Sequence, residues 1–177
     1  DKYSGNDYLE PALPKRSWYE LGAQAYYLDG LGTGTGLSIK GHFWSFIGPY
    51  LEGMFFYEGE DYLRAVRLGM QFALIQSTGF TLELYGQYQA WQGMLDRQGG
   101  TFGVQFMSFP AKPVSLQIRS GAQFFPSFTV AEFDGRLGIM QGPWEFYGGW
   151  RWWNLLATND QSIAVYQGPF FGVSRYY

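Results

Sequence analysis

The stretch Tyr62–Trp91, YLRAVRLGMQFALIQSTGFTLELYGQYQAW, decides the fold of this chain. It predicts two long strands joined by a tight turn at residues 77–79. Apolar and polar residues alternate along both strands, and successive side chains of a strand point to opposite faces. One face is therefore apolar, with Val66, Leu68, Met70, Phe72, Leu74, Phe80, Leu82, Leu84, Gly86, Tyr88 and Ala90. The other face mixes arginine, glutamate, glutamine, glycine and tyrosine, as in a closed barrel that meets lipid outside and is polar inside.

The composition of the 177 residues fits one such barrel and argues against several other classes. Aromatic residues make up 21% of the chain and charged residues only 15%. No segment approaches the ~18 uninterrupted apolar residues of a membrane helix, whereas a membrane strand needs an apolar residue only at every second position. The lack of cysteine excludes disulfides and thiolate metal sites. The net charge of −3 gives no basic surface for nucleic acid, so we expect no nucleic-acid partner.

The alternation continues through the chain and predicts an all-β fold, a closed antiparallel up-and-down transmembrane β-barrel of ten strands over residues 17–177. Eight strands are the alternative if two short segments are loops. Residues 1–16 are polar, contain Pro11 and Pro14 and show no alternation. We interpret them as an extended N-terminal segment on the periplasmic side.

The connections between the expected strands suggest an orientation. Longer polar connections at 29–36, 58–61, 93–100 and 156–161 alternate with tight turns at 45–46, 77–79, 110–113 and 142–143. Only the connection at 126–127 is shorter than this alternation requires. Outer-membrane barrels have an even strand number, short periplasmic turns and longer outer loops. This pattern predicts that both termini are periplasmic.

Together these features resemble the bacterial outer-membrane β-barrel superfamily over residues 17–177, without indicating one family within it. The alternation, the unequal connections and the terminal segment FFGVSRYY (170–177) carry the resemblance. In that superfamily a C-terminal strand ending in an aromatic residue resembles the signal read by the barrel-assembly machinery. The resemblance therefore implies an outer-membrane location, with that machinery, membrane lipid and lipopolysaccharide as partners.

Aromatic residues on the apolar face mark the expected membrane surfaces, because tyrosine and tryptophan favour the zone where apolar rings meet polar headgroups. The set expected at the periplasmic surface is Tyr19, Phe43, Phe80, Trp144 and Tyr177. The set expected at the outer surface is Tyr27, Tyr57, Tyr88 and Trp152. The alternative is a soluble barrel or sandwich in which aromatic faces pack against each other.

Charged residues on the inward face form the candidate site, and an unpaired ion in a low-dielectric lumen is costly, so they should pair. The set is Glu20, Lys40, His42, Glu52, Arg67, Glu83, Arg119, Glu132, Asp134, Arg136, Glu145 and Arg151. We interpret it as a network that plugs the lumen. A charged pathway for a small solute is the alternative. Bulky inward residues favour the plug, namely Tyr50, Phe56, Tyr85, Trp91, Tyr147 and Trp153.

Catalytic and ligand-binding motifs are weak. His42 is the only histidine, and no motif of the omptin proteases or lipid A deacylases accompanies it, so a structural role in the lumen is expected. The glycine-rich stretch 29–36 lacks the Lys-Ser/Thr ending of a phosphate-binding loop. Acidic residues of the outer connections show no calcium-loop spacing. We therefore predict no catalytic, cofactor-binding or metal-binding residues.

Three functions follow, in decreasing order of support. The first is a structural, anchoring or assembly component of a cell-envelope complex, with a possible protein partner docking on the N-terminal segment or on the lipid-facing wall. Small outward residues would let that partner approach closely, at Gly41, Gly53, Gly86, Gly135 and Gly148. The second is a narrow channel for small solutes. The third is an enzyme, for which no convergent site is found.

Overall fold

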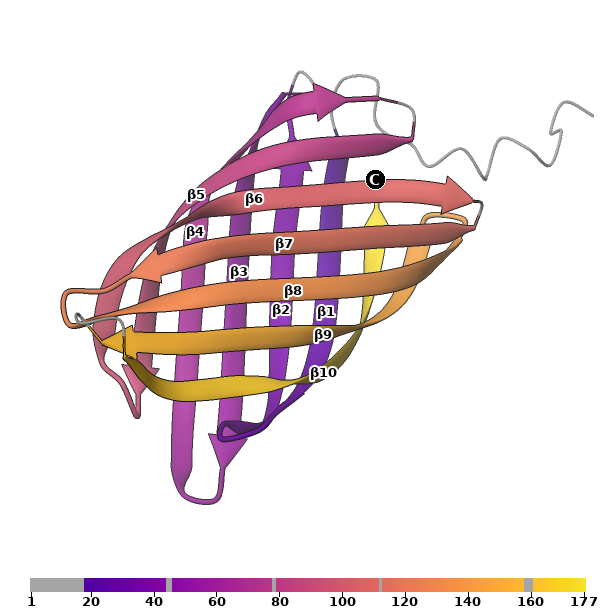
Figure 1. Ribbon diagram of the computed structural model, residues 1–177. Coiled ribbons are helices and arrows are strands. Elements are labelled where there is room, and N and C mark those ends of the chain that lie inside the picture. The colour runs from indigo at the N-terminus through magenta and orange to yellow at the C-terminus, as the bar shows by residue number, and fades with distance from the viewer. Residues whose placement is uncertain (1–17, 44–45, 78, 112, 158–160) are drawn as a thin grey trace, which may run out of the picture.

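A computed structural model describes residues 18–43, 46–77, 79–111, 113–157 and 161–177. It contains ten strands, and β10 pairs with β1 to close an antiparallel barrel. They are β1 (Trp18–Leu28), β2 (Gly32–His42), β3 (Ile47–Glu58), β4 (Asp61–Gln76), β5 (Phe80–Gly93), β6 (Arg97–Ala111), β7 (Val114–Phe124), β8 (Phe128–Gln141), β9 (Trp144–Ala157) and β10 (Ser162–Tyr176). Figure 1 shows β6 to β9 running across β1 to β4, as expected of strongly tilted strands. The predicted ten-strand barrel is confirmed, and eight strands is wrong. The N-terminal segment 1–16 lies outside the described residues.

The two rims of the barrel serve as reference points below. β1 begins and β10 ends at one rim, named here the terminal rim, which also carries the β2–β3, β4–β5, β6–β7 and β8–β9 connections. The opposite rim, named the distal rim, carries the β1–β2, β3–β4, β5–β6, β7–β8 and β9–β10 connections.

The connections that the sequence predicts to be long are short in the structure, so the predicted difference between long loops and tight turns is wrong. β2 begins at Gly32, so most of the expected loop 29–36 is strand, with Gly36 opposite Met54 of β3. β6 likewise begins at Arg97, within the expected loop 93–100. Glycine carries no strand preference, yet its backbone forms ladder hydrogen bonds like any other. Connection length therefore no longer orients the barrel.

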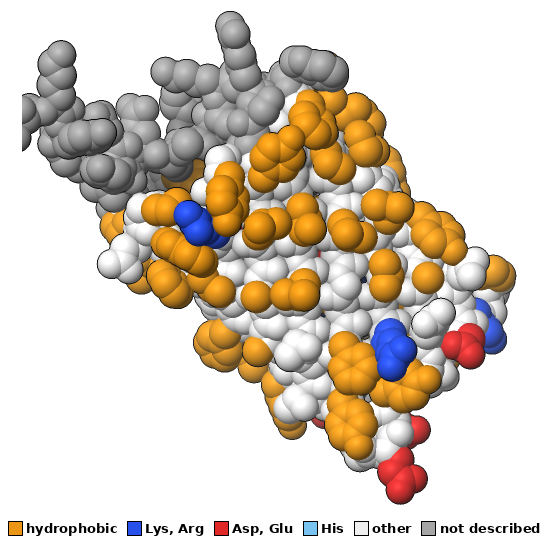
Figure 2. All heavy atoms as spheres, turned by 180° about the vertical axis from the view of Figure 1, so that it is seen from behind, with side chains coloured by type: hydrophobic (Ala, Val, Ile, Leu, Met, Phe, Trp, Pro, Cys, Tyr) orange, Lys and Arg blue, Asp and Glu red, His pale blue; other side chains and the backbone are white. Residues whose placement is uncertain are grey.

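The strands present two different faces, as their alternation predicts. Leu37, Leu68 and Phe171 project outward and are 69%, 57% and 66% exposed, whereas Arg67 and Gln89 point inward and are fully buried. Figure 2 shows apolar side chains spread over the outer wall. A register shift between Ala73 and Ile75 leaves both Leu74 and Ile75 exposed. The described residues contain no helix long and apolar enough to cross a bilayer.

The face assignment can be tested at Leu68, near the middle of β4. Leu68→Arg places a charge on the lipid-facing wall and should reduce the free energy of folding into liposomes by ~2–4 kcal/mol. Tyr57→Arg at the distal rim is the matched control and should cost only ~0–1 kcal/mol, because the penalty falls near the membrane surface. Urea titration of vesicle-inserted protein measures both. Equal stability of the Leu68→Arg variant and the unmodified protein would show that this wall does not face lipid.

Candidate functional site

The middle of the lumen holds a cluster of ions centred on Glu52 of β3. Its carboxylate lies 3.5 Å from Arg67 of β4, 3.6 Å from Arg151 of β9 and 4.0 Å from Arg119 of β7. All four side chains are at most 4% exposed. Arginine suits this position because its planar fork can contact several acceptors at once. One carboxylate thus connects three strands across the lumen.

Two further carboxylates, both from β8, balance the charge of these arginines. Arg67 Nη2 donates to Glu132 Oε2 at 2.8 Å, and Arg119 Nη2 lies 3.7 Å from Glu132 Oε1. Arg151 donates two hydrogen bonds to Asp134, at 2.7 and 2.9 Å. This bidentate geometry is the strong form of the pair. The central cluster therefore joins three cations to three anions.

A second cluster lies between the central cluster and the terminal rim. Lys40 Nζ lies 2.7 Å from Glu20 Oε2, and Arg136 Nη2 lies 3.4 Å from Glu20 Oε1 and 2.9 Å from Glu145 Oε2. Tyr176 donates to Glu145 at 2.7 Å, which ties the last strand to this cluster. Two cations again meet two anions, so this level of the lumen is neutral when all four are ionised.

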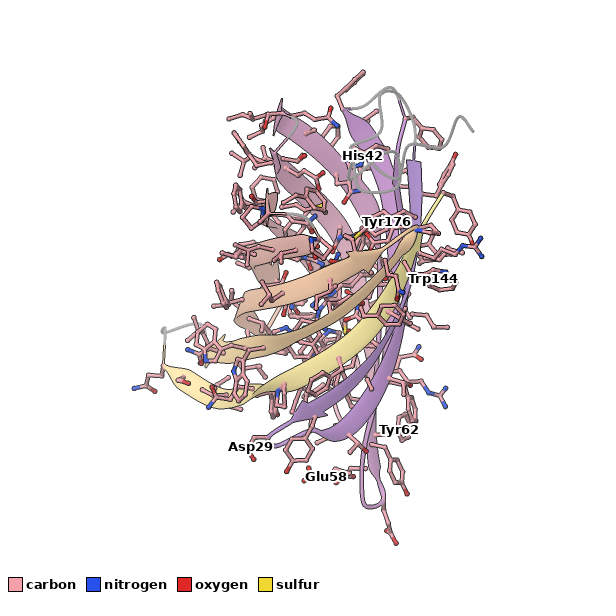
Figure 3. All side chains as sticks on the ribbon, turned by 90° about the vertical axis from the view of Figure 1, so that its right-hand side faces the viewer. Asp29, His42, Glu58, Tyr62, Trp144 and Tyr176 are labelled. Atoms are coloured by element: carbon pink, nitrogen blue, oxygen red, sulfur yellow. The ribbon has the colours of Figure 1, made fainter. Side chains whose placement is uncertain are left out.

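His42 and Glu83 form the last pair toward the terminal rim, where Figure 3 places His42. His42 Nε2 lies 3.3 Å from Glu83 Oε1, and Gln71 Nε2 lies 3.4 Å from His42 Nδ1. Gln105 donates to the other Glu83 oxygen at 3.1 Å. His42 is only 2% exposed, so its ring is enclosed by lumen side chains. This arrangement fits a structural histidine better than a general base, which needs an accessible substrate.

Aromatic rings fill the space around the ions. Arg119 lies 4.1 Å from the Tyr85 ring centre and 5.0 Å from that of Tyr50, which is cation–π geometry. The Tyr85 hydroxyl packs against Gly103, so closely that a Cβ there would collide with it. The Phe170 ring packs in the same way on Gly149. Glycines on the inner wall thus make room for large rings.

An apolar layer, named here the distal seal, lies in the lumen between the ions and the distal rim. Trp91 is its centre, 5.6 Å from Trp153 and 5.1 Å from Phe125 between ring centres. Phe125 and Phe128 stack at 4.7 Å. The layer consists of buried residues packed in one cluster, namely Leu28, Leu31, Phe56, Leu63, Ala65, Trp91, Phe125, Phe128, Val130, Trp153 and Leu155.

The sequence analysis found only part of the distal seal. It predicted inward Phe56, Trp91 and Trp153 but missed the leucines and the two phenylalanines flanking the β7–β8 connection. A signal was present, because on several strands the inward positions change from charged to apolar toward the distal rim. On β4, for example, Arg67 is followed in that direction by Ala65 and Leu63.

Little free space remains in the polar part of the lumen. One cavity there measures about 30 Å³, and its lining includes Ser38, Lys40, Glu52 and Arg119. A cavity of this size holds only a few water molecules. Among the described residues, no group of three or more histidine, aspartate or glutamate side chains is arranged to hold a metal ion.

The structure places all twelve charged residues of the predicted network in the lumen, at most 8% exposed. Of the predicted interface aromatics, Trp152 is half-buried, and the others project from the outer wall. Tyr88 and Trp152 lie several residues before the distal ends of β5 and β9, below the rim rather than at it. The other members of the predicted set, all exposed, are Tyr19, Tyr27, Phe43, Tyr57, Phe80, Trp144 and Tyr177.

The closed barrel with an apolar wall and an ionic lumen defines a membrane β-barrel. Its fold is that of the bacterial outer-membrane β-barrels, as the sequence predicts. No family model and no curated protein matches the chain.

Solved structures do match. One is the KdgM porin in complex with disordered oligogalacturonate, with a TM-score of 0.53 and 10% identity over 88% of this chain and 98% of that chain. The KdgM porin alone matches with a TM-score of 0.49 and 11% identity, over 88% of this chain and 98% of that chain. The outer-membrane protease OmpT from Escherichia coli matches with a TM-score of 0.44 and 11% identity, over 92% of this chain and 94% of that chain. The match with a TM-score of 0.53, at 10% identity, shows a similar fold and nothing more.

The central cluster yields a stability prediction. Glu52→Gln removes the carboxylate shared by three buried arginines and should lower the free energy of unfolding by about 3–5 kcal/mol, because it leaves uncompensated buried charge. Glu58→Gln, on an exposed residue at the distal end of the same strand, should leave stability unchanged. Urea unfolding in lipid vesicles, followed by tryptophan fluorescence, compares them. A Glu52→Gln variant as stable as the Glu58→Gln control would refute the role of this cluster.

Proposed function

We propose that the protein is a closed β-barrel of the bacterial outer membrane that serves as a structural or anchoring component of the cell envelope. The observation that carries this proposal is the filled lumen, in which the distal seal is stacked on paired ions around a cavity of about 30 Å³. A hydrated ion entering from the distal rim meets a layer of packed apolar rings. It would have to lose its water there without gaining polar partners, which is costly.

A narrow channel for small solutes is the second candidate, and the comparisons favour it over the anchoring role. The fold likeness to the KdgM porin supports it, since that porin was solved with an oligogalacturonate. The lumen of this chain supports it less. Its five cations face six carboxylates, so an acidic sugar would find no excess positive charge. A solute path also requires the distal seal to move aside.

An enzyme is the least supported candidate. OmpT shows that a protease shares the general architecture, but its similarity carries no argument about activity here. His42 is enclosed between Glu83 and Gln71 rather than facing an open cleft.

The orientation and partners are also part of the proposal. The even strand number brings both barrel ends to the terminal rim. The terminal strand resembles the assembly signal of outer-membrane barrels, so we place that rim in the periplasm, with the barrel-assembly machinery as a transient partner. A protein partner of the finished barrel would dock on the N-terminal segment or on the lipid-facing wall, where Gly53 and Gly86 leave the surface open.

Conductance separates the first two candidates. The unmodified protein should show no steady conductance in planar bilayers. Trp91→Ala opens the centre of the distal seal and should produce flickering leakage, together with a loss of about 3–5 kcal/mol in stability. Trp150→Ala removes an outward tryptophan, 49% exposed, and is the matched control that should stay silent. Steady, ion-selective conductance of the unmodified protein would replace the anchoring role with the channel.

A further inference from the structure

Two arginines lie outside the lumen in the same unusual setting, each held against two aromatic rings. Arg64 of β4 projects from the outer wall near the distal rim. Its guanidinium carbon is 5.6 Å from the Phe55 ring centre and 5.2 Å from that of Tyr62. These two rings are nearly parallel, with centres 6.3 Å apart and planes inclined by 17°. The Arg64 guanidinium therefore lies beside two aromatic rings on the outer wall.

Arg175 repeats this arrangement at the terminal rim. Its guanidinium carbon is 5.1 Å from the Trp144 ring centre and 4.7 Å from that of Tyr177. Figure 3 places Trp144 toward the same end of the barrel as Tyr176 and Tyr62 toward the opposite end. Figure 2 shows basic atoms next to apolar rings on the outer wall. The two arginine–aromatic groups are named here the distal clamp (Phe55, Tyr62, Arg64) and the terminal clamp (Trp144, Arg175, Tyr177).

Both clamp arginines lack an anionic partner in the part of the chain that the structure describes. Among the described residues, neither forms an ion pair or a hydrogen bond with another side chain, and both are exposed. The buried cations of the lumen, in contrast, are all paired with carboxylates. Arg97, the other exposed cation described, donates to Ser127 and to the Asp96 carbonyl. The guanidinium N–H groups of both clamps therefore have no carboxylate or side-chain acceptor among the described residues and are available to one from outside.

We propose that each clamp binds the phosphate of a membrane lipid headgroup, one at each surface of the bilayer. The inference rests on the membrane location in the proposed function and is independent of whether the lumen conducts. A guanidinium fork matches the geometry of a phosphate and pairs with it through charge-assisted hydrogen bonds. Aromatic side chains set the arginines at the level where headgroups lie.

The wall beside the distal clamp favours a lipid over free phosphate. Gly53 and Val66 follow Phe55 and Arg64 on the same outward face, toward the middle of the membrane. No atom lies within 4 Å of where a Cβ on Gly53 would be, and Val66 is 50% exposed. An acyl chain attached to the bound phosphate can therefore lie in this shallow apolar strip and add to the binding energy.

Native mass spectrometry of the detergent-solubilised full chain provides the test, with phosphorylated lipid A and its dephosphorylated form as probes. The unmodified protein should retain the phosphorylated lipid and bind the dephosphorylated one more weakly. Arg64→Gln should lower the affinity for phosphorylated lipid A about tenfold, equivalent to ~1.4 kcal/mol. Arg64→Lys keeps the charge but loses the planar guanidinium fork. Its affinity for the phosphorylated lipid should therefore lie between those of the unmodified protein and the Arg64→Gln variant. Arg97→Gln is the matched control and should bind like the unmodified protein.

The terminal clamp is tested in the same way with phosphatidylglycerol, against diacylglycerol as the phosphate-free probe. Arg175→Gln should lower the retention of phosphatidylglycerol by a similar factor. Heat-modifiable migration in gels verifies that each variant is folded, so loss of binding is separated from loss of the barrel.

Three outcomes would overturn the inference. One is equal retention of phosphorylated lipid A by the Arg64→Gln and Arg97→Gln variants. Another is equal affinity for the phosphorylated and dephosphorylated lipids. The third is competition by inorganic phosphate as effective as that by the lipid, which would identify a free-anion site. None of these outcomes depends on conductance, so the inference and the closed-lumen proposal fail separately.

Discussion

Pairing of buried charge in the lumen is the constraint on which the rest of this barrel depends. A strand that crosses a bilayer turns one face to lipid, so its charged residues must point inward, where little water remains to solvate them. Around Glu52, three arginines from β4, β7 and β9 meet carboxylates from β3 and β8. These contacts span the lumen rather than neighbouring strands alone. They fix the relative positions of strands that share no backbone hydrogen bonds.

The layers of the lumen show how side chains occupy the interior of a barrel of this size. Ten strands enclose more space than eight, in which side chains just fill the interior. Here long ion-pairing chains occupy the centre and tryptophan and phenylalanine occupy the distal part. The distal seal is an ordinary apolar core placed inside a membrane protein, and it keeps water away from the central ions from that side. The fold is shared with porins, but these side chains decide whether a path exists, because function depends on the site rather than on the fold.

Much of this was predictable from the period-two pattern, which assigns every strand residue to one of two faces. That pattern alone placed Arg67 and Glu132 in the lumen, whereas their 2.8 Å contact depends on barrel closure, since the two lie on strands that are not adjacent. The prediction of a loop at 29–36 was wrong because its glycines give no apolar–polar alternation, although β2 begins at Gly32. Phe125 and Phe128 were missed because they flank the β7–β8 connection, although each continues the inward alternation of its strand, Phe125 after Gln123 and Phe128 before Val130. The aromatic rings that each clamp arginine contacts likewise depend on the register between neighbouring strands.

The central claim is that the lumen is filled and inaccessible, and a single introduced cysteine tests it directly because the chain has none of its own. Ser38 lines the central cavity and is 7% exposed, and Ser38→Cys changes little else. Its reaction with a small charged thiol reagent should be slow in the membrane-inserted barrel and fast after unfolding in urea. Ser162→Cys, at the exposed distal end of β10, should react quickly in both states. Equal, rapid labelling of Ser38→Cys and Ser162→Cys in the folded barrel would contradict the account, because it would require an open aqueous path to the ions.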